Sequence, residues 1–254
     1  MNKIYCLLLA CFALTACQTE TAMLPVDDPG SLGEVAAIGT HLDRETAVRW
    51  TERFQTTYPN EVRAYLFGKD RLQELINRDG AKGIWFFRGL NESSEQKLVL
   101  YPADEVGKFL LTNPTRGRTE EDAPMDFAQA CPPICSGMLD GGRSFDQEVE
   151  QIGNLIPDAT AKQWMAAYQG SQSERTYGHL VGEDLLREML AVAGAQGVWL
   201  YNGLTGDGQE KLLIYPADES GEILSGHISG SGPDHIVVST LPCPIWCSGD
   251  GDGD

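Results

Sequence analysis

Apolar residues recur with helical periodicity in the first half of the chain. Ala47, Trp50 and Phe54 follow one another at spacings of three and four, which predicts a helix from about residue 44 to residue 57 with one apolar face. Asp43 stands directly before this segment, where its carboxylate can accept a hydrogen bond from a free backbone amide, so it is the expected N-cap.

The same apolar periodicity is found in the second half of the chain. Ala161, Trp164 and Tyr168 repeat the spacing, and we expect Asp158 to cap this helix and Gly170 to end it.

A second helix is expected shortly after each of these. Leu72, Leu75 and Ile76 give an apolar face to a segment that begins at Asp70, whose side chain can cap it, and that ends at Gly80. The segment 184–194 repeats this design.

The pattern then changes to one typical of β-strands. The run GIWFFRGL at 83–90 is rich in aromatic and β-branched residues, a polar loop follows, and KLVLY returns at 97–101. The second half has GVWLYNGL at 197–204 and KLLIY at 211–215. Each pair predicts a β-hairpin.

These parallels come from one internal repeat. Residues 34–107 align with 148–221 without a gap at an offset of 114, with 27 identities in 74 positions, which indicates a tandem duplication. We expect an α+β protein made of two tandem copies of a small helix–helix–β-hairpin unit. We also expect the copies to pack on each other through equivalent surfaces, as a pseudo-twofold dimer would.

A repeated phrase, YPADE, closes each hairpin. Pro102 and Pro216 cannot donate a ladder hydrogen bond and should end the pairing. The four-residue segments 104–107 and 218–221 begin with Asp and end with Gly, as type I turns favour. The alternative is that Asp104 with Glu105 and Asp218 with Glu219 are paired carboxylates for acid/base catalysis or for binding a cation. The turn is the preferred interpretation, because no repeated His, Arg or Ser stands nearby as a partner.

Two repeated tryptophans are further candidates. Trp85 and Trp199 occupy the same place in the two hairpins and are expected in the core. If they faced outward instead, they would form a platform on which a ligand could stack.

The N-terminus predicts export and a lipid anchor. Lys3 precedes an apolar run from Ile4 to Leu14, which is shorter than the roughly 20 residues that a spanning helix needs and is typical of a signal peptide. Leu14-Thr15-Ala16-Cys17 resembles the lipobox of bacterial lipoproteins, which implies lipidation of Cys17 and, because Gln18 follows, transfer to the outer membrane.

Composition restricts the partners. The net charge of −18 repels nucleic acid and anionic head groups, so we expect no nucleic-acid partner and attachment to the membrane through the lipid alone. The predicted organisation is a signal peptide at 1–16, a flexible tether at 17–32, repeat domains at 33–137 and 148–249 around a connector at 138–147, and an acidic tail at 250–254.

Four cysteines recur in two Cys-x3-Cys motifs, CPPIC and CPIWC. An exported protein meets oxidising conditions, so the first expectation is one disulfide bond within each motif, which involves Cys131, Cys135, Cys243 and Cys247. A shared zinc site of four thiolates and a redox thiol pair are the alternatives. We expect neither a metal nor another cofactor.

A resemblance rests on the strings AYLFGKDRLQELI, GIWFFRGL, KLVLYPADEVG and CPPIC. The chain resembles a group of short bacterial proteins that have an FGKD helix start, a glycine-led hairpin and a terminal Cys-Pro-x-x-Cys, usually in one copy. The resemblance covers about 34–136 and 148–248, although the second copy has LVGED where the first has LFGKD. It implies the domain and no activity.

Together these features predict an outer-membrane lipoprotein that acts as a non-catalytic binding or scaffolding module for a protein or small-molecule ligand. The alternative is a metal-binding or thiol-redox lipoprotein working through the cysteine pairs.

Overall fold

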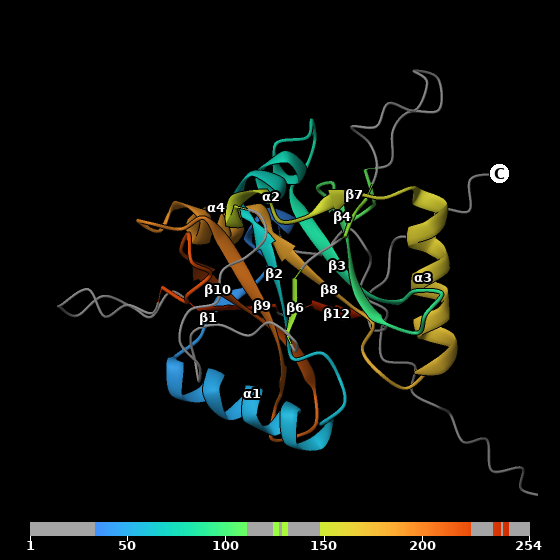
Figure 1. Cartoon of the computed structure of the whole chain (residues 1–254). Coiled ribbons are helices and arrows are strands. Elements are labelled where there is room, and N and C mark those ends of the chain that lie inside the picture. The colour runs from blue at the N-terminus through green and yellow to red at the C-terminus, as the bar shows by residue number, and fades with distance from the viewer. Residues whose placement is uncertain are drawn as a thin grey trace, which may run out of the picture. The chain divides into compact units, whose positions relative to one another are not determined.

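A computed structural model describes residues 34–110, 124–126, 129–131, 148–224, 236–239 and 241–243. It is an α+β structure in which helices combine with antiparallel sheets. Figure 1 shows the elements along the chain. The described residues belong to one compact unit, Leu32–Asp254. No helix among them is long and apolar enough to cross a membrane.

The described residues of the first copy form one 3-10 turn, two helices and six strands: η2 (Val35–Ala37), β1 (Thr40–His41), α1 (Arg44–Thr57), β2 (Ala64–Gly68), α2 (Lys69–Ile76), β3 (Gly83–Leu90), β4 (Gln96–Ala103), β5 (Met125–Asp126) and β6 (Gln129–Cys131). The second copy repeats this order: η4 (Val149–Gln151), β7 (Asn154–Leu155), α3 (Asp158–Ser171), β8 (Gly178–Gly182), α4 (Glu183–Ala191), β9 (Gly197–Leu204), β10 (Glu210–Ala217), β11 (Val237–Val238) and β12 (Leu241–Cys243).

Each sheet contains strands from both copies. One sheet has the order β1-β11-β10-β9-β2-β6, and the other has the order β12-β8-β3-β4-β5-β7. The strand β2 of the first copy therefore lies beside the second copy's hairpin β9–β10, while β8 of the second copy lies beside the hairpin β3–β4 (Figure 1). The two helices and the hairpin expected in each copy are present, but the sheets do not divide into one helix–helix–hairpin unit per copy.

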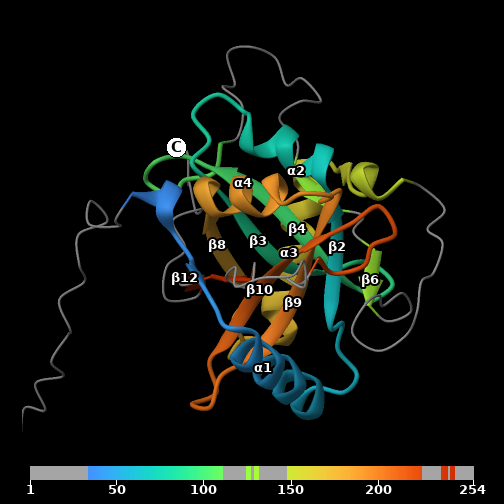
Figure 2. The ribbon, with the colours of Figure 1, turned by 90° about the vertical axis from the view of Figure 1, so that its left-hand side faces the viewer.

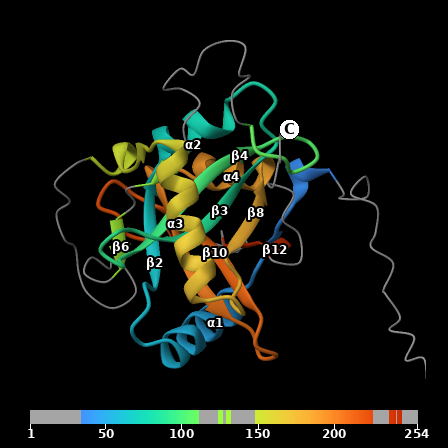
Figure 3. The same cartoon turned by 90° about the vertical axis from the view of Figure 1, so that its right-hand side faces the viewer.

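The two sheets pack against each other and are covered on their outer faces by the long helices. The inner core joins alternate residues of both sheets, such as Phe86 and Leu200, to the inward faces of α2 and α4. The residues between these on the same strands, such as Trp85 and Trp199, point away from the inner core and pack under α3 and α1 respectively. In Figures 2 and 3 α2 and α4 lie together at one end of the sheets, away from α1.

Two glycines mark where the backbones of the copies meet. Gly68 precedes α2 and donates its amide to Ile152 O at 2.8 Å, and Gly182 donates in the same way to Ile38 O at 2.8 Å. A Cβ atom at Gly68 would lie 2.2 Å from Glu150 O, and one at Gly182 would lie 2.1 Å from Ala36 O. Only glycine leaves room for the 3-10 turn of the other copy at these two positions.

The predicted bounds of α1 are confirmed. The predicted N-cap is confirmed as well, because Asp43 Oδ1 accepts a hydrogen bond from Thr46 N at 2.9 Å. The other expected caps are wrong. Asp70 lies inside the first turn of α2, after Gly68. Asp158 begins α3 without capping it, and its carboxylate accepts from the Tyr101 hydroxyl at 2.9 Å. Gly170 does not end α3, which continues to Ser171.

The hairpin strands extend further than expected. Pro102 pairs with Ile84 and Pro216 pairs with Val198, so pairing continues to the alanine after each proline. A proline lacks only the amide donor, and its carbonyl still accepts: Pro102 O accepts from Leu110 N at 2.9 Å, and Pro216 O accepts from Leu224 N at 2.9 Å.

Candidate functional site

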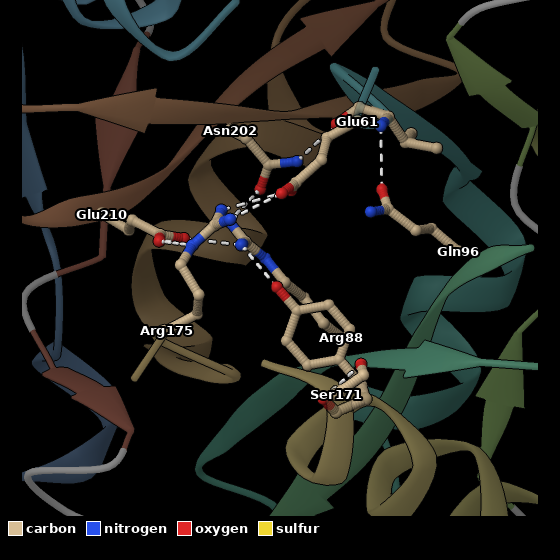
Figure 4. A network of polar contacts seen from close by, with 9 residues as sticks. Glu61, Arg88, Gln96, Ser171, Arg175, Asn202 and Glu210 are labelled. Atoms are coloured by element: carbon tan, nitrogen blue, oxygen red, sulfur yellow. Dashed lines mark hydrogen bonds and ion pairs between the residues drawn. The ribbon is translucent and has the colours of Figure 1, made fainter. Parts of the chain in front are cut away.

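A buried polar network lies between the two sheets at the end of strands β3 and β9. Arg88 follows Ile84 and Phe86 on the inward face of β3, and Asn202 follows Val198 and Leu200 on the inward face of β9. Arg88 Nη2 donates to Asn202 Oδ1 at 2.8 Å (Figure 4). Polar side chains thus continue the same strand faces that build the apolar core.

Two carboxylates neutralise two guanidinium groups in this network. Glu210 Oε2 lies 2.5 Å from Arg88 Nη1, and the side chains of Arg88 and Glu210 are 7% and 5% exposed. Arg175 Nε contacts the other oxygen of Glu210, and its Nη1 lies 2.5 Å from Glu61 Oε1 (Figure 4). Because arginine stays protonated in proteins, each guanidinium needs such a partner when it is removed from water.

Aromatic rings and a hydroxyl complete the surroundings of the guanidinium groups. Arg175 Cζ lies 3.7 Å from the centre of the Tyr58 ring, and Arg88 Cζ lies 5.5 Å from the centre of the Phe54 ring. Arg88 Nη1 also donates to the Tyr168 hydroxyl at 3.0 Å. Phe54 and Tyr168 come from the last turns of α1 and α3, so the network fastens both outer helices to the sheets.

The chain entering β2 is held by the same network. Asn202 Nδ2 donates to Val62 O at 2.9 Å, and Val62 N donates to Gln96 Oε1 at 2.8 Å (Figure 4). The arrangement fixes strand positions. Its two carboxylates, Glu61 and Glu210, are both paired with arginines.

A second buried polar pair lies on β8 and just after β11. His179 Nδ1 is 2.7 Å from Ser239 Oγ, and both residues are buried. His179 Nε2 has no hydrogen-bond partner among the described residues. Burial lowers the pKa of His179 well below its usual range, and the positive charges of Arg88 and Lys211 lower it further.

We predict that His179 makes the protein less stable in mild acid. Because the pKa of His179 is lowered in the folded state, the unfolded state binds more protons once the pH falls below about 6.5. The free energy of unfolding should therefore fall by about 1 kcal/mol from this residue between pH 6.5 and 5.5. Urea unfolding at several pH values, with His179→Leu as the comparison, measures the difference.

The control for this prediction is His41→Gln, which removes a histidine whose side chain is 44% exposed and not buried. A pH slope that is unchanged in His179→Leu would contradict the assignment.

The structure places the sequence-predicted residues as follows. Trp85 and Trp199 are 1% and 0% exposed, and their indole groups donate to Gly107 O and Gly221 O, each at 2.8 Å. The expected core position is confirmed, and a stacking platform of solvent-exposed indoles is wrong because α3 and α1 cover the two rings.

The YPADE segments form turns. Asp104 O accepts from Gly107 N at 3.0 Å while Asp104 Oδ1 accepts from Val106 N and Lys108 N. Asp218 makes the corresponding contacts in the second copy, with Gly221 N, Ser220 N and Glu222 N. Each Asp carboxylate thus serves the backbone of its own turn, as in an Asx-turn, whereas Glu105 and Glu219 are exposed. The structure does not bring these four acids together with the network.

The cysteine predictions fall mainly outside the described residues. The backbone of Cys131 in β6 pairs with Ala64, and that of Cys243 in β12 pairs with Gly178, while Cys135 and Cys247 lie outside the described residues. The strands β6 and β12, which hold the backbones of Cys131 and Cys243, lie on opposite sides of the sheets (Figures 2 and 3). Disulfide bonds within each motif stay a prediction. The described residues contain no cluster of ligands suited to a metal ion.

No family model, curated protein or solved structure matches this chain.

Sequence reasoning missed the residues of the network. The signal that could have found them is the repeat itself, because Glu61 aligns with Arg175 and Arg88 aligns with Asn202. Positions where a duplicated chain changes charge are candidates for contacts between the copies.

Proposed function

We propose that the chain is a lipid-anchored outer-membrane protein whose two copies form a single fused unit. This unit acts as a non-catalytic binding or scaffolding module for a protein or small-molecule ligand. The Leu14–Cys17 lipobox supports the anchor. The buried network carries the non-catalytic part of the proposal, because its charged side chains are used to hold strands of both copies together.

The strand registers support a pseudo-twofold relation between the copies. The strand β2 pairs with β9 through Ala64 and Tyr201, and β8 pairs with β3 through Gly178 and Phe87. Adding the repeat offset of 114 to Ala64 gives Gly178, and adding it to Phe87 gives Tyr201. The two pairings are therefore equivalent under exchange of the copies, as a dimer interface with twofold symmetry requires.

The lipid anchor is tested in a Gram-negative host with a clickable palmitate analogue. We expect the wild-type chain to incorporate the label and to fractionate with the outer membrane, and Cys17→Ala to do neither, because the lipobox cysteine supplies the acylated thiol. The matched control is Cys11→Ala within the predicted signal peptide, which should still be labelled. An acylated Cys17→Ala variant in the membrane fraction would refute the proposed anchor.

A further inference from the structure

We propose that the two copies are specialised to pair with each other and not with themselves, through complementary residues placed where equivalent positions meet. The partner that this surface fits is the other copy, within the chain or from a second chain. The inference rests on the fused arrangement proposed above.

The first complementary contact joins Glu61 and Arg175, which are equivalent positions at the repeat offset. Arg175 Nη1 donates to Glu61 Oε1 at 2.5 Å, and Arg175 Nη2 donates to Glu61 Oε2 at 3.2 Å. Equivalent residues can touch each other only close to a twofold axis. If either copy paired with itself, this contact would become Glu against Glu or Arg against Arg.

The second contact of this kind is that of Arg88 with Asn202, which are also equivalent. Pairing of the first copy with itself would bring two buried guanidinium groups together. It would also replace Glu210, the partner of Arg88, by the equivalent Gln96. The charge on Arg88 would then lose its neutralising carboxylate.

A third difference lies near the other end of the sheets. Lys82 Nζ of the first copy is 3.0 Å from Glu183 Oε1 of the second. The equivalent contact joins the backbones of Lys69 and Gln196, with Lys69 N donating to Gln196 O at 2.8 Å. If the first copy paired with itself, Lys69 of one copy would meet Lys82 of the other at each of these two equivalent contacts. Like charges in such contacts disfavour the wrong partner.

The central test separates the copies after folding. A protease site is inserted within the connector 138–147 of the chain, and the folded protein is cleaved. We expect the two fragments to remain together in size-exclusion chromatography under reducing conditions and to unfold in one transition. Two fragments that separate as folded monomers would overturn both the fused arrangement and the present inference.

The second step asks which pairs form. The cleaved protein is unfolded in urea and refolded by dialysis, and native mass spectrometry identifies the folded pairs. Specialised copies should return only the pair with one fragment of each kind. Self-paired fragments in statistical proportion, or the absence of the mixed pair, would overturn the specialisation. In that case the fused arrangement would still be supported, provided that the two fragments had stayed together in the chromatography after cleavage.

Substitution in the uncleaved chain gives an independent measure. Glu61→Gln removes the attraction to Arg175, whereas Glu61→Arg creates the contact that self-pairing of the second copy would have. We expect Glu61→Arg to lower the folding equilibrium constant at least about tenfold more than Glu61→Gln. The matched control is Glu52→Arg at an exposed position on α1, which should change it less than about threefold. Equal effects of the two substitutions at Glu61 would overturn the role assigned to charge.

Discussion

Replacing Glu210 by glutamine is expected to lower the free energy of unfolding by about 3–5 kcal/mol. Glutamine has nearly the same shape, so the change removes the negative charge and leaves the packing space filled. Arg88 and Arg175 both contact this carboxylate, and Arg88 is almost wholly buried. A buried guanidinium without its counterion costs much more than an exposed ion pair contributes.

Urea unfolding of the variant measures the loss. Glu95→Gln is the matched control, since Glu95 pairs with Lys97 in the hairpin of the first copy and its side chain is 64% exposed. The loss of stability in this control should stay below about 1 kcal/mol. Adding Arg88→Met to Glu210→Gln should recover part of the lost stability, because the uncompensated charge is then gone as well. A loss at Glu210 no larger than that at Glu95 would contradict the electrostatic account.

Gly68→Ala and Gly182→Ala are each expected to destabilise the protein by about 3 kcal/mol. The backbone at these glycines has ordinary negative φ values of −74° and −70°, so the cost does not come from a strained conformation. It comes from the carbonyl oxygens of Glu150 and Ala36, about 2 Å from the added methyl group. Both oxygens belong to the backbone of the other copy and cannot rotate away as a side chain could.

Thermal or urea unfolding compares these variants with Gly170→Ala. Gly170 lies in α3, and a Cβ atom there meets nothing within 4 Å, so alanine should stabilise the helix by up to about 1 kcal/mol. If Gly68→Ala behaved like Gly170→Ala, the close approach of the two copies would be wrong.

Local patterns in the sequence were enough to predict α1 and the hairpins. The helix α1 has a clear apolar period and a capping residue beside it, and each hairpin has two strands close together in sequence. The strands β2 and β8 were missed because a buried run of five residues directly before a helix has no period of its own. Their partners lie in the other copy, so no local signal reveals them.

The candidate site was harder to predict than the fold. A search for identities between the copies led to Trp85 and Trp199, which are repeated because both copies need them in the core. The charged network depends instead on differences, since Arg88 meets Asn202 and Glu61 meets Arg175. Sequence identity identifies what the copies share, and it passes over the residues at which they recognise each other.

The mixed sheets also set the order in which the protein can form. A chain leaves the ribosome, or a translocation channel, with its N-terminus first, so β2 emerges long before its partner β9 at Gly197–Leu204. Until then the first copy has an unpaired apolar strand and the hairpin β3–β4 lacks its neighbour β8. Contacts this distant in sequence fold slowly and leave strand edges exposed in the meantime. The nascent protein is therefore most vulnerable to aggregation and proteolysis when its first copy is complete and its second is not.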